Sequence, residues 1–541
     1  MTTSYIYSIN SDFTSATTVN LIQLTNLINS NTTIDVNCEE IFLDGDAITI
    51  NFLSSLDTVQ EAELVNVIHS YTFIDIAPIH VSKSHGALVS NDLDNPGDYF
   101  SISEAFAAGE QSVYVKNGVY YESSDIIIGN FGQLIGESTG GVSIVLLNGH
   151  SIKADGSGGI IESAGTISIT HNTNIVTGIG TTFTNLAPGN FILIGTNYHN
   201  ILSIESDTSL TMITTYQGIT IINDAYYASA MHSGIIINNI IIISPNMLTA
   251  GVGLYFRSIR HSYISAIVIT KTNPNIILQN CSDISISDII VYTGNGDGIE
   301  IYNCHSVLLN TINVFNNTDN GVYINNCVDV IISGCAGENN SSNGFMIVNS
   351  KFVKIINSVL KYNNNNGIHI DANSHGSIMS NNTIYKNKNV GIISFSSNNT
   401  ILGNIISTNG MYGIQAGVNN AVTNNQIISN TDYGIFLPAS SDMCIISNNQ
   451  IDICDSNCIQ VESSECLISN NIITNSLSNG IYINGSDNYV TGNIVKLNDE
   501  TGILIGSLSL DNIISLNIAK NNTTSNLVDN GTNTVLLNNN I

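Results

Sequence analysis

The chain has 541 residues and is strongly acidic, with 42 Asp and Glu against 13 Lys and Arg and a formal net charge of −29. Such a surface repels nucleic-acid phosphates and anionic membranes, so we expect neither as a partner. Ile and Asn are over-used and Trp is absent. Because Asn, Gly, Ser, Thr and Ile disfavour helix interiors, the composition excludes a helix-rich protein.

The first stretch, MTTSYIYSINSDFT, lacks the basic and apolar regions of a secretory signal. No apolar run reaches transmembrane length, so we expect no membrane insertion. The nine Cys contain no CxxC pair, which argues against a disulfide framework and a zinc site. We therefore expect no metal, no cofactor and folding in a reducing cytosol.

Residues 1–84 do not repeat and predict a small α+β head. Residues 41–43 and 48–50 are apolar strand candidates around an acidic Gly turn. The segment DTVQEAELVNVIHSY, residues 57–71, has helical spacing of its apolar residues, and Thr58-x-x-Glu61 fits a capping box.

Residues 85–162 predict a linker, a capping helix and the first coils of a solenoid. The linker, residues 81–98, begins just before this range. Ser101-x-x-Glu104 fits a capping box, and Gly109 stands where a helix C-cap belongs. This helix would plug the open end of the solenoid. Residues 163–232 contain five or six short strand patterns with turns, which predict an inserted small β-barrel.

Residues 233–541 repeat with a period of about 22–23 residues, which predicts a right-handed parallel β-helix. Leucine-rich repeats have a similar period, but their Leu framework is missing. A glycine precedes most of the alternating apolar runs: Gly298, Gly321, Gly344, Gly367, Gly391, Gly413, Gly434, Gly480 and Gly502. Inward positions after each are apolar, as in Ile299 and Ile301.

Two further columns keep the same period. Cys281, Cys304 and Cys327 are expected to be buried, since free Cys behaves as a small hydrophobe. The second column consists of asparagines whose amides can bond one coil away at the ~4.8 Å strand spacing: Asn404, Asn425, Asn449, Asn471, Asn493 and Asn517.

The outward positions between the inward pairs form one column, which we expect to be an exposed strip. It comprises Glu300, Tyr323, Met346, His369, Ile393, Gln415, Phe436, Gln460, Tyr482 and Leu504. Its aromatic residues could stack on sugar rings or meet neighbouring subunits. Its apolar members favour an oligomer.

The opening segment FSISEAF…SVYVKNGVYYES…LIGES and the repeats resemble the pectin-lyase-like superfamily, and the former is similar to the first coil of pectin methylesterases and viral tailspikes. The inserted segment, VTGIGTTFTNLAPGNFILIG, resembles a module of phage and viral fibre proteins. The Ile and Asn bias and the head are similar to structural proteins of large amoeba viruses. The resemblance implies a virion fibre or spike, trimeric, attached through its head to other virion proteins.

The stretch GNGDGIEI resembles the NTDGID motif of polygalacturonase-type glycosidases, whose Asp is catalytic. The resemblance gives Asp297 that role, and Asp319 matches the first carboxylate of the pair one coil later. The second position of that pair is Asn320, the expected His is Asn343, and the Arg-x-Lys motif has no match. Asn320, Asn343, Asn366 and Asn479 share the column of Asp297, so a turn residue is the alternative interpretation.

Other candidate groups are weaker. Carbohydrate contacts are assigned to Glu300, Tyr323, His369, Asp371 and Tyr482. Lyase chemistry needs a base, and the stretch FRSIRHSYIS, with Arg257, Arg260 and His261, is the one locally basic region, with Lys271 further along. No cluster fits a pectin methylesterase.

We therefore expect a virion fibre or spike without catalysis, presenting a surface to host polysaccharide or to other subunits. The alternative is a polysaccharide-degrading enzyme, hydrolase before lyase, using Asp297 and Asp319. The expected location is the virion, after synthesis in the host cytoplasm; a cell-surface or secreted adhesin is the other possibility.

Overall fold

The computed structural model describes the chain except residues 1–2, 9–27, 29–37, 45–46, 53, 71–86, 92–96, 139, 157–159, 195–196, 217, 230 and 248. It forms two compact units, Met1–Ser82 and Lys83–Ile541. Among the described residues, no helix is long and apolar enough to cross a membrane.

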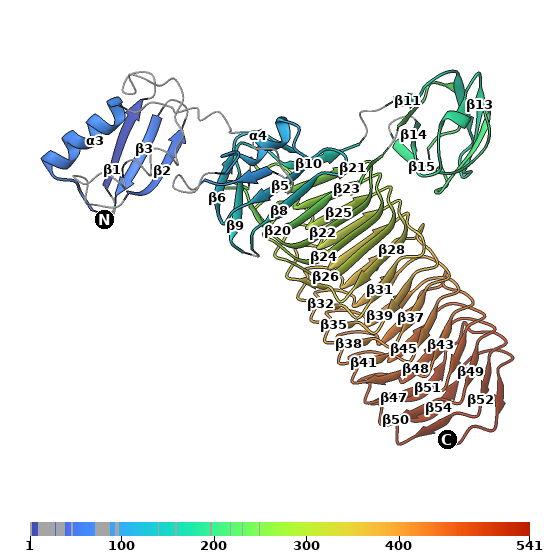
Figure 1. Ribbon diagram of the computed structural model, residues 1–541. Helices are drawn as coiled ribbons and strands as arrows, with labels where there is room; N and C mark the ends of the chain where they lie inside the picture. The colour runs from blue at the N-terminus through green and yellow to red at the C-terminus, as the bar shows by residue number, and fades with distance from the viewer. Residues whose placement is uncertain are drawn as a thin grey trace. The chain divides into compact units, whose positions relative to one another are not determined.

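The described residues of the first unit include a three-stranded antiparallel sheet and helix α3 (Figure 1). Strand β3 (Ala47–Phe52) lies between β1 (Thr3–Ser8) and β2 (Cys38–Asp44), and helix α3 spans Thr58–Ser70.

The predicted cap of α3 is displaced by one residue. The Asp57 carboxylate accepts from the backbone N–H groups of Val59 and Gln60, both at 2.9 Å, and the Gln60 side chain accepts from the Asp57 N–H at 2.9 Å. Asp57 and Gln60 therefore form the reciprocal capping box in place of Thr58 and Glu61.

The second unit begins with solenoid strands that flank a short helix. Strand β4 (Ala87–Val89), inside the predicted linker, already pairs in parallel with β5 (Ser112–Val115). Helix α4 (Ile102–Ala107) has Ser101 as N-cap, as predicted, and Gly109 follows the C-cap with a φ of 90°. The buried Glu122 carboxylate also accepts from the Ile102 N–H at 2.7 Å, which complements the helix N-terminus.

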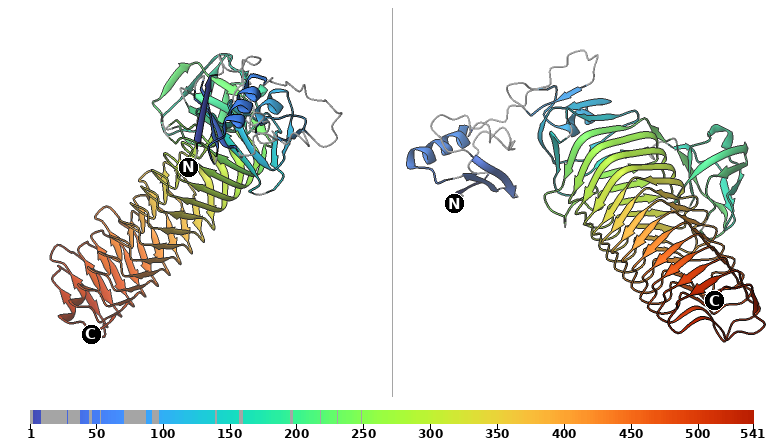
Figure 2. Two further views of the ribbon diagram at one scale, coloured as in Figure 1. Left: turned by 90° about the vertical axis from the view of Figure 1, so that its left-hand side faces the viewer. Right: turned by 90° about the horizontal axis from the view of Figure 1, so that it is seen from below.

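The solenoid is a right-handed parallel β-helix, as predicted, with its coils stacked along one axis (Figures 1 and 2). One face is a 15-stranded parallel sheet. Its strands are β7 (Ile126–Ile127), β10 (Ile152–Asp155), β21 (Leu254–Arg257), β23 (Ile276–Gln279), β25 (Ile299–Tyr302), β27 (Val322–Asn325), β30 (Phe345–Val348), β33 (Ile368–Ile370), β36 (Ile392–Ser394), β39 (Ile414–Ala416), β42 (Ile435–Leu437), β45 (Ile459–Val461), β48 (Ile481–Ile483), β51 (Thr501–Ile505) and β54 (Ser525–Asp529).

The remaining faces belong to a 29-stranded sheet. Its early strands, besides β4 and β5, are β6 (Gly118–Glu122), β8 (Gln133–Gly136), β9 (Val142–Leu146), β19 (His232–Ser233), β20 (Ile236–Ile243), β22 (Ile259–Thr270), β24 (Ser282–Tyr292) and β26 (His305–Phe315). Strand β26 pairs with both β28 and β29, so the single long strand splits into two ladders.

Each later coil contributes one short strand to each of these ladders. The first ladder comprises β28 (Val328–Ser333), β31 (Lys354–Ile356), β34 (Ile378–Ser380), β37 (Thr400–Leu402), β40 (Ala421–Thr423), β43 (Ile445–Ser447), β46 (Leu467–Ser469), β49 (Tyr489–Thr491), β52 (Ile513–Ser515) and β55 (Val535–Leu537). The second comprises β29 (Ala336–Glu338), β32 (Val359–Lys361), β35 (Thr383–Tyr385), β38 (Ile405–Ser407), β41 (Gln426–Ile428), β44 (Gln450–Asp452), β47 (Ile472–Thr474), β50 (Ile494–Lys496) and β53 (Ile518–Lys520).

The glycine column is explained by close contact between coils. A Cβ on Gly321 would lie 2.6 Å from the Gly344 carbonyl oxygen, and one on Gly413 would lie 2.6 Å from that of Gly434. These contacts are shorter than side chains tolerate, so glycine is needed for proximity and not for an unusual φ.

The asparagines serve two structural purposes. In the predicted column, each buried amide donates to the next, from Asn404 to Asn425 at 2.9 Å and from Asn425 to Asn449 at 3.0 Å. Others occupy corners with positive φ, which Asn tolerates better than most residues, as at Asn316, Asn339, Asn381 and Asn424. Both uses account for the Asn bias.

The cysteine column is buried, as predicted. Within the column, the Cys281 N–H donates to the Cys304 sulfur and the Cys304 N–H donates to the Cys327 sulfur, both at 3.3 Å. All eight cysteines whose side chains the structure describes are free and buried.

An antiparallel eight-stranded sheet interrupts the solenoid after β10. Its own apolar core includes Phe183, Ile192 and Leu210. Its strands are β11 (Ile160–Glu162), β12 (Thr166–Ile169), β13 (Ile175–Ile179), β14 (Phe191–Ile194), β15 (Asn197–Ser206), β16 (Ser209–Met212), β17 (Ile221–Asp224) and β18 (Tyr227–Ser229), with a 3-10 turn at Phe183–Asn185. We call this region the inserted sheet; whether 163–232 is an independent barrel domain stays a prediction.

Candidate functional site

The candidate site lies on the outward face of the 15-stranded sheet. The predicted outward column is in register from coil to coil, with Glu300 opposite Tyr323 and Gln460 opposite Tyr482. The expectation of a fully exposed strip is wrong, because Ile393 is 7% exposed and Gln460 is 4% exposed. Glu300, Tyr323, His369 and Tyr482 are half-buried.

Asp297 ends a ladder of buried amides. Its Oδ1 accepts from the backbone N–H of Asn320 at 2.7 Å and from the Asn320 amide at 2.8 Å. Asn343 donates to Asn320 in the same way, and Asn366 donates to Asn343. A carboxylate only accepts hydrogen bonds, so Asp297 is suited to the accepting end of this ladder. The turn interpretation thus has a specific structural basis.

Asp319 lies close to Asp297. The Asn320 Nδ2 donates to the Asp297 Oδ1 at 2.8 Å and to the Asp319 Oδ1 at 3.2 Å, so these two oxygens are no more than about 6 Å apart. Inverting glycosidases place their carboxyl groups ~6.5–9.5 Å apart and retaining ones ~5–5.5 Å apart. The bound applies to one oxygen of each carboxyl group, so it does not distinguish the inverting from the retaining separation.

The environment of Asp297 favours its protonated form. Burial, reinforced by the neighbouring Asp319 and Glu300 carboxylates, raises the pKa of Asp297 to about 7, although its Asn320 hydrogen bonds act in the opposite direction. Burial also raises the pKa of Glu300 above its usual range. Asp319 is exposed. A buried acid that is protonated near neutrality beside an exposed carboxyl group is an arrangement that can transfer a proton.

Two tyrosines complete this first cluster. The Tyr302 hydroxyl donates to the Glu300 Oε2 at 2.9 Å, and burial together with Glu300 raises the pKa of Tyr302. The rings of Tyr302 and Tyr323 are 5.7 Å apart and tilted by 58°. Tyr302 lies two residues from Glu300 on strand β25, so alternation places both side chains on the outward side. It was missed because only the outward position between each inward pair was followed along the coils.

His369 and Asp371, predicted as a pair, have separate surroundings. Asp371 caps a turn, where its Oδ1 accepts from the Ser374 hydroxyl at 2.6 Å and from the N–H groups of Asn349 and Asn373 at 3.2 Å. Burial lowers the pKa of His369, and its ring packs edge-on against Phe395 at 5.6 Å. Asp371 is therefore committed to the turn, which leaves His369 and Phe395 as the surface groups.

A second aromatic cluster lies further along the same face. Tyr412 and Tyr433 stack with ring centroids 5.2 Å apart and an angle of 15°, and Phe436 lies 5.1 Å from Tyr412 and 5.4 Å from Tyr433. The two tyrosines immediately precede Gly413 and Gly434, so they occupy the column of Asp297. Their position before the glycines could have been read from the sequence, but only the asparagines of that column were considered.

The predicted basic region is paired with carboxylates only in part. Arg257 lies 3.8 Å from the Asp155 carboxylate, and His261 lies 3.5 Å from that of Asp283. Among the described side chains, Arg260 and Lys271 belong to no ion pair, so a base for lyase chemistry in this region stays a prediction.

Comparison with family models supports the fold over the C-terminal half. Residues 311–451 match the model described as a right-handed β-helix region, and residues 414–541 match that of a periplasmic copper-binding protein, NosD. No curated protein matches the sequence significantly.

Solved β-helix structures resemble this chain at low identity. The A-module of a mannuronan C-5 epimerase from Azotobacter vinelandii is 13% identical with a TM-score of 0.48, covering 68% of this chain and 93% of that one. The tailspike gp61 of Pseudomonas phage phi297 is 12% identical with a TM-score of 0.46 and coverages of 77% and 74%. The gp54 tailspike of Acinetobacter baumannii bacteriophage AP22, solved with a capsular saccharide, is 11% identical with a TM-score of 0.41 and coverages of 79% and 74%.

The copper that the NosD description names does not fit the described residues. Within 414–541 all four cysteines, Cys444, Cys454, Cys458 and Cys466, are buried inside the coils. Among the residues that the structure describes, no group of three or more His, Cys, Asp or Glu side chains could hold a metal ion. We derive no copper chemistry for this chain.

Proposed function

We propose that this protein binds an extended carbohydrate chain along the outward face of the 15-stranded sheet. The observation that carries this proposal is that each of the two aromatic clusters has one ring in the same register column, Tyr323 in the first and Phe436 in the second. Tyr323 and Phe436 are five rungs apart, which corresponds to roughly 24 Å at the ~4.8 Å spacing between strands. Aromatic rings at both ends of such a distance suit a polymer better than a single small molecule.

The charge of this face favours neutral or amino sugars. Asp297, Glu300 and Asp319 lie at one end, and the second cluster lies near Asp432 and Glu462, whose charges raise the pKa of Tyr433 in addition to burial. Carboxylates accept hydrogen bonds from sugar hydroxyl and amino groups and repel uronates.

The test is retention on immobilised polysaccharides. We expect the protein to be retained on a neutral or amino polysaccharide. The affinity of the Tyr412→Ala/Tyr433→Ala variant for that polysaccharide should be at least tenfold lower. Exposed Tyr489 on strand β49 belongs to the 29-stranded sheet, so Tyr489→Ala is a matched control. Equal retention of the Tyr412/Tyr433 variant and the wild type would exclude this face as the binding surface.

A second candidate function is cleavage of the bound chain, supported by the raised pKa of Asp297 beside Asp319. In this mechanism protonated Asp297 donates its proton to the glycosidic oxygen, and Asp319 accepts a proton from a water molecule that attacks the anomeric carbon. The glycosidic C–O bond breaks as the new C–O bond to water forms, so one water is consumed for each cleavage. Assays for new reducing ends and for unsaturated uronides would compare wild type with Asp297→Asn/Asp319→Asn. Absence of both products for the wild type on every neutral, amino and acidic polysaccharide that it binds would rule out this candidate.

We further propose that the binding surface belongs to a virion spike, a homotrimer attached through the Met1–Ser82 unit. The support is the sequence resemblance to viral fibre modules. Light scattering of purified protein would give the mass of the assembly, and mass spectrometry of purified particles would show whether the chain is a virion component. A monomer absent from particles would favour a secreted or cell-surface protein.

A further inference from the structure

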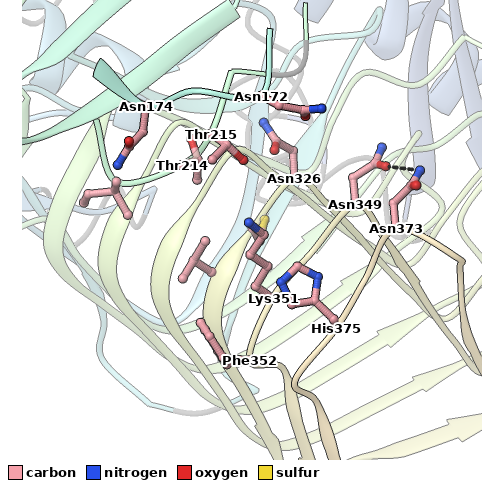
Figure 3. Close-up of a pocket in the computed structure, with 13 residues that line it drawn as sticks. Asn172, Asn174, Thr214, Thr215, Asn326, Asn349, Lys351, Phe352, Asn373 and His375 are labelled. Atoms are coloured by element: carbon pink, nitrogen blue, oxygen red, sulfur yellow. Dashed lines mark hydrogen bonds between the residues drawn. The ribbon is translucent and has the colours of Figure 1, made fainter. Parts of the chain in front are cut away.

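A pocket of about 560 Å³ lies where the inserted sheet approaches the β-helix (Figure 3). The inserted sheet contributes residues 172, 174 and 213–215 to its lining, and the β-helix contributes residues from three successive coils. Figure 3 shows Lys351 and His375 side by side, with the Lys351 side chain directed toward Asn326 and the residues of the inserted sheet. The pocket is separate from the outward face described above, because its β-helix residues follow the 15-stranded sheet in each coil.

The charge of this pocket is opposite to that of the protein. None of its thirteen lining residues is Asp or Glu, although the chain carries a net charge of −29. None of the ion pairs among the described side chains includes Lys351. Of the nearby carboxylates, Asp329 lies 3.4 Å from His305, and Asp371 accepts from the Ser374 hydroxyl and from the N–H groups of Asn349 and Asn373. Neither carboxylate belongs to the pocket lining.

Phe352 adds an exposed aromatic surface to the pocket. It adopts a φ of 57° in a corner column where positive φ recurs from coil to coil, as at Asp329 and Met443, so this conformation belongs to the repeat. Its ring lies over Gly376, where a Cβ would be 2.8 Å from the ring carbons, and 6.4 Å from the His375 ring. The side chain is 48% exposed, so a ligand can reach the ring.

Side-chain amides supply the remaining polar groups. Asn373 donates to Asn349 at 2.8 Å and Asn326 donates to Asn303 at 2.7 Å, so each amide is held in place by the neighbouring coil. Each NH₂ group has two hydrogens, so a second hydrogen bond remains possible for both. Positioned amides beside an ammonium group and an aromatic ring are groups that recognise a sugar bearing a carboxylate.

We propose that this pocket binds an acidic monosaccharide unit, with its carboxylate on Lys351 and its ring against Phe352. This site is independent of the proposed function of the outward face, which favours sugars without negative charge. It assigns Lys351, Phe352, Asn326 and Asn373 a role in ligand binding.

The test uses D-glucuronate as the probe, with D-glucose and inorganic phosphate as comparisons, in saturation-transfer NMR followed by calorimetric titration of the full chain. We expect glucuronate to bind and glucose to bind at least tenfold more weakly. Lys351→Gln should weaken glucuronate binding roughly tenfold, because hydrogen bonds to charged groups are among the stronger ones. Phe352→Asn, which suits the positive φ, should weaken glucuronate binding without weakening any binding of phosphate.

Lys354→Gln is the matched control, because Lys354 is exposed, three residues away and outside the pocket lining. Several results would overturn the proposal: no glucuronate binding by the wild type, equal loss in the Lys354 and Lys351 variants, or glucuronate binding that is unchanged in Phe352→Asn. The last result would reduce the pocket to a general anion site.

Discussion

The residues that precede the glycine column differ between two groups of coils, those of residues 297–367, here called the upper coils, and those of residues 412–434, here called the lower coils. After the lower coils the column returns to buried amides, Asn457 and Asn479. In the upper coils, Asp297, Asn320, Asn343 and Asn366 form a buried hydrogen-bonded ladder. In the lower coils, Tyr412 and Tyr433 occupy the same column and stack their rings at 5.2 Å. One backbone position thus serves as an internal support in one region and as an aromatic surface in the other. Function in a solenoid therefore depends on which coils depart from the structural pattern.

The largest expected effect comes from the glycines that both regions share. Gly413→Val should abolish folding or lower the melting temperature severely, because its Cβ would lie 2.6 Å from the Gly434 carbonyl oxygen. Gly334→Asn is the control, since that position has a φ of 62° and open space around it. Thermal unfolding followed by circular dichroism measures both variants. A Gly413→Val variant as stable as the control would refute the steric explanation of the column.

The next effect concerns the ladder of the upper coils. Asn343→Leu removes the amide that donates to Asn320 and accepts from Asn366, both buried. Leaving buried polar groups without partners costs about 1–3 kcal/mol each, so we expect a loss of roughly 2–5 kcal/mol in the free energy of unfolding. Denaturant unfolding measures this loss. The control Asn364→Ala, on the exposed surface of the same turn region, should change the free energy of unfolding by less than about 0.5 kcal/mol.

The pH dependence of Asp297 gives a smaller effect. Because its pKa is raised to about 7 in the folded protein, the folded state binds more protons than the unfolded state between about pH 4 and pH 7. This contribution to stability is present at low pH and is lost as the pH rises through 7. The free energy of unfolding of Asp297→Asn minus that of the wild type should therefore be larger at pH 8 than at pH 5, by a few kcal/mol at most. A difference between the two proteins that is equal at both pH values would contradict the raised pKa.

The smallest effect on stability is expected in the lower coils. Tyr412→Ala removes a partly exposed ring, and the stacking with Tyr433 contributes about 0.5–1.5 kcal/mol beyond burial. We expect the melting temperature to fall by only a few degrees while retention on polysaccharide is lost. A large loss of stability without a change in retention would show that these tyrosines stabilise the fold, as the Asn320–Asn366 amide ladder does, and do not bind the polysaccharide.

Much of the fold was predictable because its determinants repeat. A period of about 22–23 residues stacks each coil on the preceding one. This period predicts the Gly, Asn and Cys columns, the inward apolar pairs and the register of Glu300 with Tyr323. The helix cap at Asp57 and Gln60 was misplaced by one residue because Thr58 and Glu61 satisfy the same sequence pattern.

The candidate site was predictable only in part. The identity of Asp297 and Asp319 came from a motif, but the spacing of their oxygens depends on the shared Asn320 amide, which no motif records. The burial of Ile393 and Gln460 depends on neighbouring turns, so alternation alone made the strip too exposed. The Lys351 pocket joins segments more than 110 residues apart, from Thr215 to Asn326, and the sequence contains no period that relates them.

The amide ladder tolerates coils of unequal length. Asn404 and Asn425 are 21 residues apart, Asn425 and Asn449 are 24 apart, and their hydrogen bonds measure 2.9 and 3.0 Å. Turns absorb the extra residues while every contact remains between adjacent coils. Duplication or deletion of one whole coil would therefore lengthen or shorten the molecule by a fixed step of ~4.8 Å without disturbing the others. The β-helix is thus a molecular ruler, whose reach can change in evolution independently of the surfaces that it carries.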